Sequence, residues 1–520
     1  MKTKVNLIYL LIVILFTVPA VVALFHPGFF VTDDGNWMII RFSAFYEALR
    51  SGQFPVRFLY RLNNSYGYPV TDFLYPLFMY IGTPIHVLGF SFVNTIKIIL
   101  GLSIFASSIF TFLWLRKSFG NLASVIGAVS YALFPYHLYD IYTRGSVGEA
   151  LALSIVPFIF WQIERKSLFL ISLGISFLIL SHNSLALLFL PVIIIYMYLK
   201  VDRRNKNRKN EIYRYFLSII FGLFLSAFFW LPALFDKQYT VFDEVAVSDF
   251  SRYFITYENI GLLGIISLVT FLLGLILFFI RKNKYFGYFL IVSIIFTLLS
   301  LSFSKIIWDI FPFTNLIQFP FRLLSVVCLG VAYLISYEID FFKKKYRLFI
   351  SIVFLFIIFI SAANYIYPKT FENYPDTYYS TNQDTTTVKN EYMPKWVKEV
   401  PQEIPKEKVT VIKGHQSIEN LNIVNNKISF NYYSPDETTI QINTVYFPGW
   451  IVEVDGKKTE IDYKDNGLIK FSTTKGPHVV KAWFQETEFR LTADFISIVS
   501  FFALLLILKL NMFKNESKSN

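Results

Sequence analysis

Two adjacent acids, Asp33 and Asp34, stand in a polar and aromatic stretch between two strongly apolar segments of the chain. A carboxylate in such a place can accept the proton of an acceptor hydroxyl, or bind a divalent cation together with phosphate oxygens. Two carboxylates in tandem allow one to act as the base while the other positions substrate or metal. The competing interpretation is that the pair only caps the helix that follows and favours its dipole. The pair is therefore a candidate catalytic site.

Polar side chains of the kind that hold an anionic group occur near the acid pair and in later loops. The candidate binding residues are Arg41, Lys97, Arg144, Glu149, Gln318 and Arg322. Arg binds phosphate oxygens in bidentate fashion, and both Arg and Lys stabilise charge that builds on a departing phosphate. Arg144 precedes a helix start and Arg322 follows Pro320, which begins a helix. At each place a guanidinium and a helix N-terminus can therefore face the same anion. The competing interpretation is that such cations only extend to lipid head-groups.

The composition places these residues in a membrane protein. Of the 520 residues, 55% are hydrophobic, 19% are aromatic and only 16% are charged, with a mean hydropathy of +0.50. A soluble globular domain carries about 25% charged residues. The net charge of +12 falls in short clusters of Lys and Arg between apolar runs, as cytoplasmic loops require, and this distribution excludes a nucleic-acid partner. The single cysteine, Cys328, cannot form an intramolecular disulfide.

The apolar runs predict about twelve transmembrane helices. They lie near residues 5–24, 93–115, 121–140, 148–163, 168–181, 184–199, 215–235, 259–280, 285–303, 321–340, 348–366 and 490–509. The first has a basic start and no clear cleavage site, which favours a retained signal-anchor helix. With the N-terminus inside, every loop on the inner side is basic. The predicted topology places both termini in the cytoplasm, the protein in the cytoplasmic membrane, and the acid pair outside.

The loop of residues 26–92 is predicted to hold two surface helices. The stretch Phe73–Phe90 contains Pro76, Gly82 and Pro84, and counting it as a span would invert the charge distribution of every later loop. We therefore predict that it lies in the outer interface. Before it, Thr32 or Asp33 can cap a helix over residues 35–51, which Gly52 ends.

The domain organisation follows from a change in composition after residue 366. Residues 1–366 form the transmembrane domain, residues 367–489 an extracytoplasmic β-rich domain, and residues 490–520 the final helix and a cytoplasmic tail. A linker rich in proline precedes strands near 409–412 and 427–433. Strands over 446–454, 457–463, 468–473 and 478–484 are predicted to form a meander, completing a small β-sandwich.

Two further patterns bear on function. The predicted spans carry almost no ionisable residues at mid-depth, where a transporter usually has polar groups and broken helices. His182 and Asn183 are best explained as a tight turn between helices. The aromatic residues Tyr75 and Tyr80 are best explained as part of an interface belt.

Several motifs resemble one family of bacterial membrane proteins. The first block consists of Asp33-Asp34-Gly35, the stretch Leu49–Arg57, Tyr66-Gly67-Tyr68-Pro69 and Tyr75-Pro76-Leu77. Together with Arg144, Glu149 and the stretch Gln318–Arg322, it is similar to proteins labelled 6-pyruvoyl-tetrahydropterin synthase-related. Phe447-Pro448-Gly449-Trp450 and Val454-Asp455-Gly456 resemble the outward β-domain of YfhO-like proteins.

This resemblance implies a fold and an activity. Such proteins look like members of the GT-C superfamily, whose multi-helix glycosyltransferases use polyprenyl-phosphate sugars at the outer membrane face. The implied function is transfer of a sugar from a polyprenyl-phosphate donor to an envelope glycan or protein acceptor. Alternatives from other classes are a flippase or transporter of lipid-linked glycans, and a non-catalytic envelope-assembly protein.

Two departures limit what the resemblance implies. Pterin synthase chemistry needs a zinc site of histidines, whereas the six His here are scattered over the chain. Many relatives carry a histidine near the acid pair, where this chain has Asn36 and Trp37. A histidine-assisted or metal-binding role at that position is therefore not implied for this chain.

Overall fold

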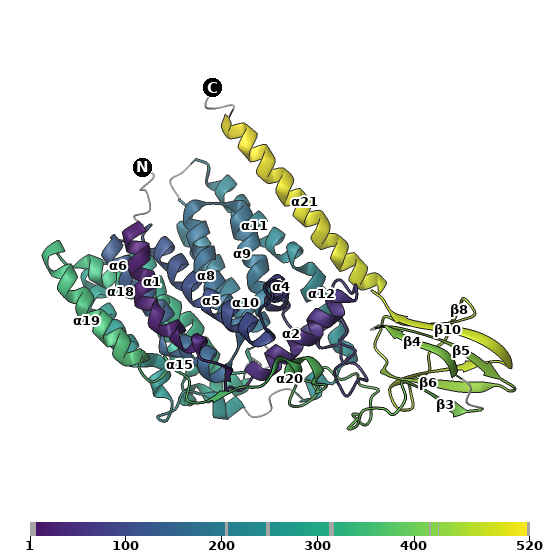
Figure 1. Cartoon of the computed structure of the whole chain (residues 1–520). Coiled ribbons are helices and arrows are strands. Elements are labelled where there is room, and N and C mark those ends of the chain that lie inside the picture. The colour runs from purple at the N-terminus through teal and green to yellow at the C-terminus, as the bar shows by residue number, and fades with distance from the viewer. Residues whose placement is uncertain are drawn as a thin grey trace.

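The computed structural model describes residues 7–202, 206–245, 250–310, 317–414, 418–424 and 426–516, with side chains up to residue 509. Figure 1 shows a bundle of helices, a β-structured region beside one end of it, and a long final helix that runs back along the bundle. The chain therefore follows the predicted order of a helical membrane domain, a β-rich region and a last helix.

Nine stretches of helix in the described part of the chain are long and apolar enough to cross a membrane. They are α1–η1 (Leu7–Thr17 and Val18–Phe25), α5 (Phe92–Leu115), α6–α7–η2 (Asn121–Ala132, Pro135–Tyr139 and Asp140–Arg144), α8 (Val147–Arg165), α10 (Asn183–Lys200), η5–α14 (Ile260–Leu263 and Gly264–Ile280), η7–α18 (Pro320–Leu323 and Leu324–Phe341), α19 (Lys344–Ala362) and α21 (Glu488–Glu516). A tenth is the pair α11 (Arg208–Leu225) and α12 (Ala227–Asp236), which is bent by 64°. The shorter apolar helices α9 (Leu168–Ser181) and α15 (Lys284–Ser300) fill the two remaining predicted ranges.

Small and hydroxylated residues let these helices pack closely. Ser107 of α5 donates to the carbonyl of Ile104 at 2.8 Å, and Thr111 donates to that of Ser107 at 2.7 Å, so both hydroxyls are satisfied within their own helix. A Cβ on Gly127 of α6 would lie 2.1 Å from Oγ of Ser336 on α18. Small residues at such crossings are typical of helix packing in membranes.

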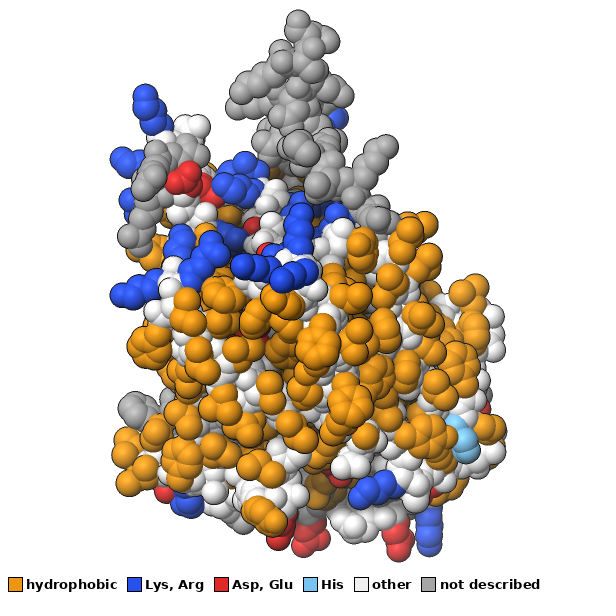
Figure 2. Space-filling view, turned by 90° about the vertical axis from the view of Figure 1, so that its left-hand side faces the viewer, with side chains coloured by type: hydrophobic (Ala, Val, Ile, Leu, Met, Phe, Trp, Pro, Cys, Tyr) orange, Lys and Arg blue, Asp and Glu red, His pale blue; other side chains and the backbone are white. Residues whose placement is uncertain are grey.

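Charged side chains gather at one end of the bundle. Figure 2 shows Lys and Arg crowded above a broad hydrophobic belt, with acidic and basic residues mixed below it. The start of α1 and the end of α21 lie at the top of the bundle in Figure 1. The assignment of this end to the cytoplasm remains a prediction from the positive-inside rule.

The loop between the first two spans contains three helices, α2 (Gly35–Arg50), α3 (Val70–Phe73) and α4 (Leu77–Val87). The range of α2 agrees with the predicted helix over 35–51. Its first turn is capped by Thr32, whose Oγ1 accepts from the N–H of Gly35 at 2.9 Å. Since α4 has 11 residues, it is about 16 Å long and cannot cross a hydrocarbon core of about 30 Å. Val87 and Leu88 at its end are 65% and 79% exposed.

The β-structured region is a sandwich of two sheets. One sheet has the order β4-β5-β10-β7-β8 and the other β3-β6-β9. The strands are β3 (Val409–Lys413), β4 (Ile418–Val424), β5 (Lys427–Ser434), β6 (Thr438–Val445), β7 (Trp450–Val454), β8 (Lys457–Thr459), β9 (Leu468–Thr473) and β10 (Gly476–Phe484). A shared core that includes Phe430, Ile442, Phe471 and Val480 lies between the sheets. The predicted meander is wrong, because β9 leaves β8 and pairs with β6 in the opposite sheet.

The segment after α19 lies against the loop of residues 26–92 and crosses the start of α2. Strand β1 (Phe29–Phe30) pairs antiparallel with β2 (Phe371–Glu372), and the short helix α20 (Asp376–Thr381) packs on α2 (Figure 1). Oη of Tyr68 lies 2.9 Å from Oγ1 of Thr387. We call residues 370–387 the strap. The remaining short helices are η3 (Lys237–Tyr239), α13 (Phe242–Val245), η4 (Phe250–Tyr253), η6 (Ser302–Ser304) and α16 (Lys305–Ile310).

Candidate active site

The acid pair is fixed by its backbone rather than by its side chains. The N–H of Asp33 donates to the carbonyl of Thr143 at 3.0 Å, and the N–H of Asp34 donates to that of Arg144 at 2.8 Å. Gly145, with φ at +70°, allows this approach, because a Cβ there would lie 2.5 Å from Oγ1 of Thr32. The two acids therefore lie beside Arg144, although more than a hundred residues separate them in sequence.

The carboxylates of this pair are open to a ligand. Asp33 is exposed and Asp34 half-buried, and neither side chain hydrogen-bonds or forms an ion pair with any residue the structure describes. Because Thr32 provides the cap of α2, capping does not account for the two side chains. Partial burial and the charge of Asp34 raise the pKa of Asp33 above its ordinary value, while Arg144 opposes this shift.

Behind the pair lies a buried set of charged residues that we call the Glu149 cluster. It comprises Asp140, Arg144, Glu149, His182 and Arg322, all at most 5% exposed. Oε1 of Glu149 lies 2.5 Å from Nη1 of Arg144 and 2.8 Å from Nη2 of Arg322. Nη1 of Arg144 also contacts Oδ1 of Asp140 at 2.7 Å. Two guanidinium groups thus face two carboxylates, which offsets much of the cost of burying them.

The two arginines of this cluster differ in their remaining donors. Arg322 uses Nε and Nη2 on Glu149, and Nη1 on the Ile317 carbonyl at 2.5 Å and on Oε1 of Gln318 at 3.3 Å. Arg144 makes both of its ion pairs through Nη1, and its Nε and Nη2 have no acceptor among the described residues. Its guanidinium lies 5.3 Å from the ring centres of both Phe319 and Phe321. Arg144 is therefore the cation of the cluster with free hydrogen-bonding capacity.

His182 and Tyr75 complete the cluster on the side of α9 and α10. Nδ1 of His182 accepts from the N–H of Leu185 at 3.3 Å, and Nε2 lies 3.6 Å from Oε1 of Glu149. Burial lowers the pKa of His182 to about 3, so its ring is neutral and Nε2 carries the proton that faces Glu149. The turn predicted at His182-Asn183 is present, and its histidine is in addition a cluster residue. The ring of Tyr75 packs 4.7 Å from that of His182.

Two of the predicted binding cations lie outside the cluster. Arg41 is buried and donates from Nε to Oγ1 of Thr386 at 2.9 Å and from Nη2 to the Thr386 carbonyl, which anchors the strap. Lys97 donates to the carbonyls of His26 at 2.5 Å and Gly28 at 3.0 Å, and so fixes the start of the loop that carries the acid pair. Their roles in this structure are contacts with backbone on either side of the site.

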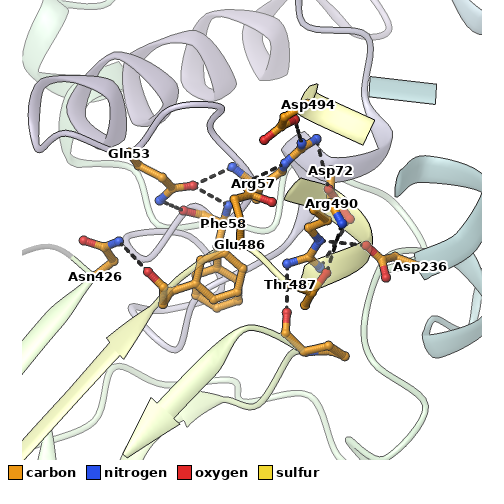
Figure 3. A network of polar contacts seen from close by, with 12 residues as sticks. Gln53, Arg57, Phe58, Asp72, Asp236, Asn426, Glu486, Thr487, Arg490 and Asp494 are labelled. Atoms are coloured by element: carbon orange, nitrogen blue, oxygen red, sulfur yellow. Dashed lines mark hydrogen bonds and ion pairs between the residues drawn. The ribbon is translucent and has the colours of Figure 1, made fainter. Parts of the chain in front are cut away.

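A second charged network, which we call the joint, connects the loop of residues 26–92, α12, the β-sandwich and α21 (Figure 3). It comprises Arg57, Asp72, Asp236, Glu486, Arg490 and Asp494. Nε of Arg57 lies 3.0 Å from Glu486, and its Nη2 lies 3.1 Å from Asp494. Nε of Arg490 lies 2.8 Å from Asp236, and its Nη1 donates to the carbonyl of Pro448 at 2.8 Å.

Sequence reasoning did not single out several of these residues. Asp140 stands four residues before Arg144, a spacing that places both on one face of a helix, and this signal was available in the sequence. Tyr75 was assigned to the interface belt, but it is only 7% exposed and packs in the cluster. Among the described residues, no group of three or more His, Cys, Asp or Glu is arranged to hold a metal ion.

The bundle of apolar helices, with Lys and Arg gathered above a broad hydrophobic belt, defines a polytopic membrane protein. The chain belongs to the 6-pyruvoyl-tetrahydropterin synthase related domain family, described as a membrane protein, whose model matches residues 72–368. The match includes the Glu149 cluster. It begins after the acid pair and ends before the β-sandwich.

Individual proteins show partial likeness to this chain. An uncharacterized protein of Lactococcus lactis subsp. cremoris (strain MG1363) is 26% identical over 266 residues, which cover 48% of this chain and 43% of that protein. The arabinofuranosyltransferase AftD from Mycobacteria aligns with 71% of this chain and 27% of its own, at 15% identity and a TM-score of 0.48. The Archaeoglobus fulgidus oligosaccharyltransferase aligns over 76% of this chain and 61% of its own, at 14% identity and a TM-score of 0.47. The chain spans less than two-thirds of each of these proteins.

Proposed function

We propose that this protein is a membrane glycosyltransferase that moves a sugar from a polyprenyl-phosphate donor to an envelope acceptor on the outer face of the cytoplasmic membrane. The observation that carries the proposal is the open acid pair held beside Arg144. Two carboxylates without protein partners can take the proton of the acceptor hydroxyl. A guanidinium with free N–H groups can bind the phosphate of the sugar donor. The motif resemblance supports the same reaction.

The proposed reaction is a single inverting displacement. Asp33 or Asp34 takes the proton of the acceptor hydroxyl, and the hydroxyl oxygen forms a bond to the anomeric carbon. The bond from that carbon to the phosphate oxygen breaks, and polyprenyl phosphate leaves as an anion. Asp33 is the better base, because it is the more exposed and its pKa is raised. The other acid positions substrate or, with substrate oxygens, a divalent cation.

The leaving phosphate requires cationic partners rather than a general acid. Arg144 supplies Nε and Nη2 to its oxygens, and Glu149 and Asp140 hold the guanidinium in place. Arg322, each of whose guanidinium nitrogens already contacts an acceptor, adds positive charge from behind Glu149. The β-sandwich guides the acceptor toward the acid pair. The concentration of Lys and Arg at the opposite end supports the outward orientation of the site.

The test is a transfer assay with the purified chain in lipid nanodiscs. A panel of polyprenyl-phosphate sugars and an envelope glycan fraction are supplied, and the new glycosidic bond and free polyprenyl phosphate are both quantified. The Asp33→Asn, Asp34→Asn double variant is expected to lose about 10²–10⁴-fold in rate, the usual contribution of a positioned base. The matched control is the Glu244→Gln, Glu258→Gln variant, which neutralises two exposed acids that contact neither the acid pair nor the Glu149 cluster.

The outcomes separate the three classes of function. Undiminished transfer by the Asp33→Asn, Asp34→Asn variant would refute the proposal. Movement of a lipid-linked glycan across proteoliposomes without a new glycosidic bond would identify a transporter instead. A requirement for residues 367–488 in cells, with no effect of the acid substitutions, would identify an assembly protein.

A further inference from the structure

A pocket of about 380 Å³ lies on the outer loop, at the end of α2 opposite to the acid pair. Tyr46, Glu47 and Arg50 of the last turns of α2 line it, with Arg61, Phe92 at the start of α5, and Ser380 of the strap. These residues come from four separate parts of the sequence. The pocket is therefore a product of the fold, and the strap is one of its walls.

The frame of the pocket is rigid. Arg61 contacts Oε2 of Glu47 at 3.1 Å and Oγ of Ser43 at 2.7 Å, and it also donates to the carbonyl of Ser380. The N–H of Phe92 donates to Oδ1 of Asp376 at 3.0 Å, which joins α5 to the strap. Side chains whose positions are fixed by such contacts recognise a ligand at a smaller entropic cost.

The pocket keeps unused polar groups and aromatic surface. Arg50 makes no ion pair or hydrogen bond with the described residues, and its guanidinium lies 5.8 Å from the ring centre of Tyr46. The Glu47 side chain is 41% exposed, and only its Oε2 contacts Arg61. The half-buried ring of Tyr46 offers the aromatic surface, whereas Phe92 is 7% exposed and stacks on His86 with ring centres 4.0 Å apart. With two arginines and one glutamate, the charged groups in the lining sum to one positive charge.

This combination fits a sugar unit with an acidic substituent. The C–H faces of a sugar ring pack on aromatic rings, and its hydroxyls exchange hydrogen bonds with carboxylate and guanidinium groups. The free guanidinium of Arg50 can bind a carboxylate or phosphate group in bidentate fashion. A purely apolar ligand would leave Arg50 and Glu47 desolvated without partners.

The position of the pocket relates it to the acid pair. Both lie on α2, and the rise along the helix from Gly35 to Glu47 is about 18 Å. A single sugar cannot span this separation, whereas an extended oligosaccharide can. We infer that the pocket binds an acidic sugar unit of the acceptor while a hydroxyl farther along the same chain reaches Asp33 and Asp34. The acceptor is thus an extended anionic glycan, an inference that rests on the proposed transfer reaction.

The test measures binding without transfer, so that it does not depend on the donor. A fluorescently labelled short oligogalacturonate and its carboxyl-reduced counterpart are titrated into the full chain in nanodiscs of neutral lipid. The acidic oligosaccharide is expected to bind more tightly. Arg50→Gln is expected to weaken its binding about 10–100-fold, the range for a charge-assisted hydrogen bond, and to leave the reduced oligosaccharide unaffected. Lys389→Gln, at an exposed lysine, is the matched control.

Two results would overturn the inference. One is equal binding of the acidic and reduced oligosaccharides with no effect of Arg50→Gln. The other is displacement of the acidic oligosaccharide by vesicles that contain anionic lipid, which would assign the pocket to a lipid head-group. A Tyr46→Leu variant should weaken both oligosaccharides, because the aromatic face serves either. If transfer is also measurable, Arg50→Gln should raise KM for the acidic acceptor and leave kcat unchanged.

Discussion

The Glu149 cluster and the joint are both buried sets of charges, but only the cluster lies beside a pair of open acids. In the Glu149 cluster two arginines face two acids, and Arg144 keeps two nitrogens without an acceptor among the described residues. In the joint two arginines face four acids, and each guanidinium nitrogen of Arg57 lies within 3.5 Å of a carboxylate. Free donors beside open acids are typical of a ligand site, whereas buried arginines that pair with acids from several separate segments are typical of a structural contact.

The largest expected effect concerns the joint. Arg490→Met leaves Asp72 and Asp236 buried without their shared cation, and we expect it to lower the free energy of unfolding by about 3–5 kcal/mol. Thermal unfolding of the full chain in detergent measures this loss. Adding Asp72→Asn to Arg490→Met removes one of the stranded charges and should recover part of it. Equal melting temperatures of Arg490→Met and wild type would contradict the structural role.

A smaller effect concerns the acid pair itself. The transfer rate should fall as the pH decreases through the pKa of Asp33, which lies above the ordinary value of 3.8, because the base must be ionised. Asp34→Asn removes a neighbouring negative charge and should move this limb of the pH–rate profile to lower pH, by up to about one unit. Arg144→Gln removes a positive charge and should move it to higher pH. Identical profiles in all three proteins would exclude Asp33 as the titrating group.

The smallest effect concerns an ion pair at the surface of the β-sandwich. Hydrogen bonds from the Val479 N–H and from His478 lower the pKa of Asp455. Burial lowers the pKa of His478, but its hydrogen bonds to Asp455 and to the Thr474 carbonyl, together with the charge of Asp455, outweigh burial and raise this pKa. His478 contributes to the stability of the folded protein fully below its ordinary pKa of 6.5, and this contribution is lost as the pH rises through its raised pKa. The contribution of Asp455 to stability is lost as the pH falls through its lowered pKa.

The pair should therefore stabilise the protein most between about pH 4 and pH 6.5, and by less than about 1 kcal/mol. The melting temperature of the full chain, compared with that of His478→Gln across this range and above it, tests the sign. A difference between the two proteins that grows toward alkaline pH would contradict it.

The sequence predicted the helices well, because a long apolar run determines a membrane helix without reference to the rest of the chain. The helix over 35–51 was also predicted, with Thr32 as one of two possible caps. The strand β6 was missed, because TTIQINTV carries Thr, Gln and Asn, and only the packing of the two sheets explains why Ile440 and Ile442 are buried. The meander failed because the order of strands in a sandwich depends on contacts that span the whole region.

Only part of the candidate site could be predicted from the sequence. Arg144, Glu149 and Arg322 meet in the Glu149 cluster, Gln318 contacts Arg322, and the acid pair lies beside them. Arg41 and Lys97 bind backbone carbonyls, and nothing in the local sequence distinguishes such a lysine or arginine from a phosphate ligand. The contact of Asp72 with Arg490 joins distant segments and has no local signature.

The pairing of β1 with β2 has a consequence for the order in which the protein is made. Phe29 and Phe30 emerge early from the ribosome, but their partners Phe371 and Glu372 follow only after α19 has been synthesised. Thr386, which holds Arg41, comes later still, and Arg490 belongs to the last helix. A chain that stalls before α19 is complete therefore has the acid pair without the strap that confines it. The candidate site therefore receives its strap only after α19 has been synthesised.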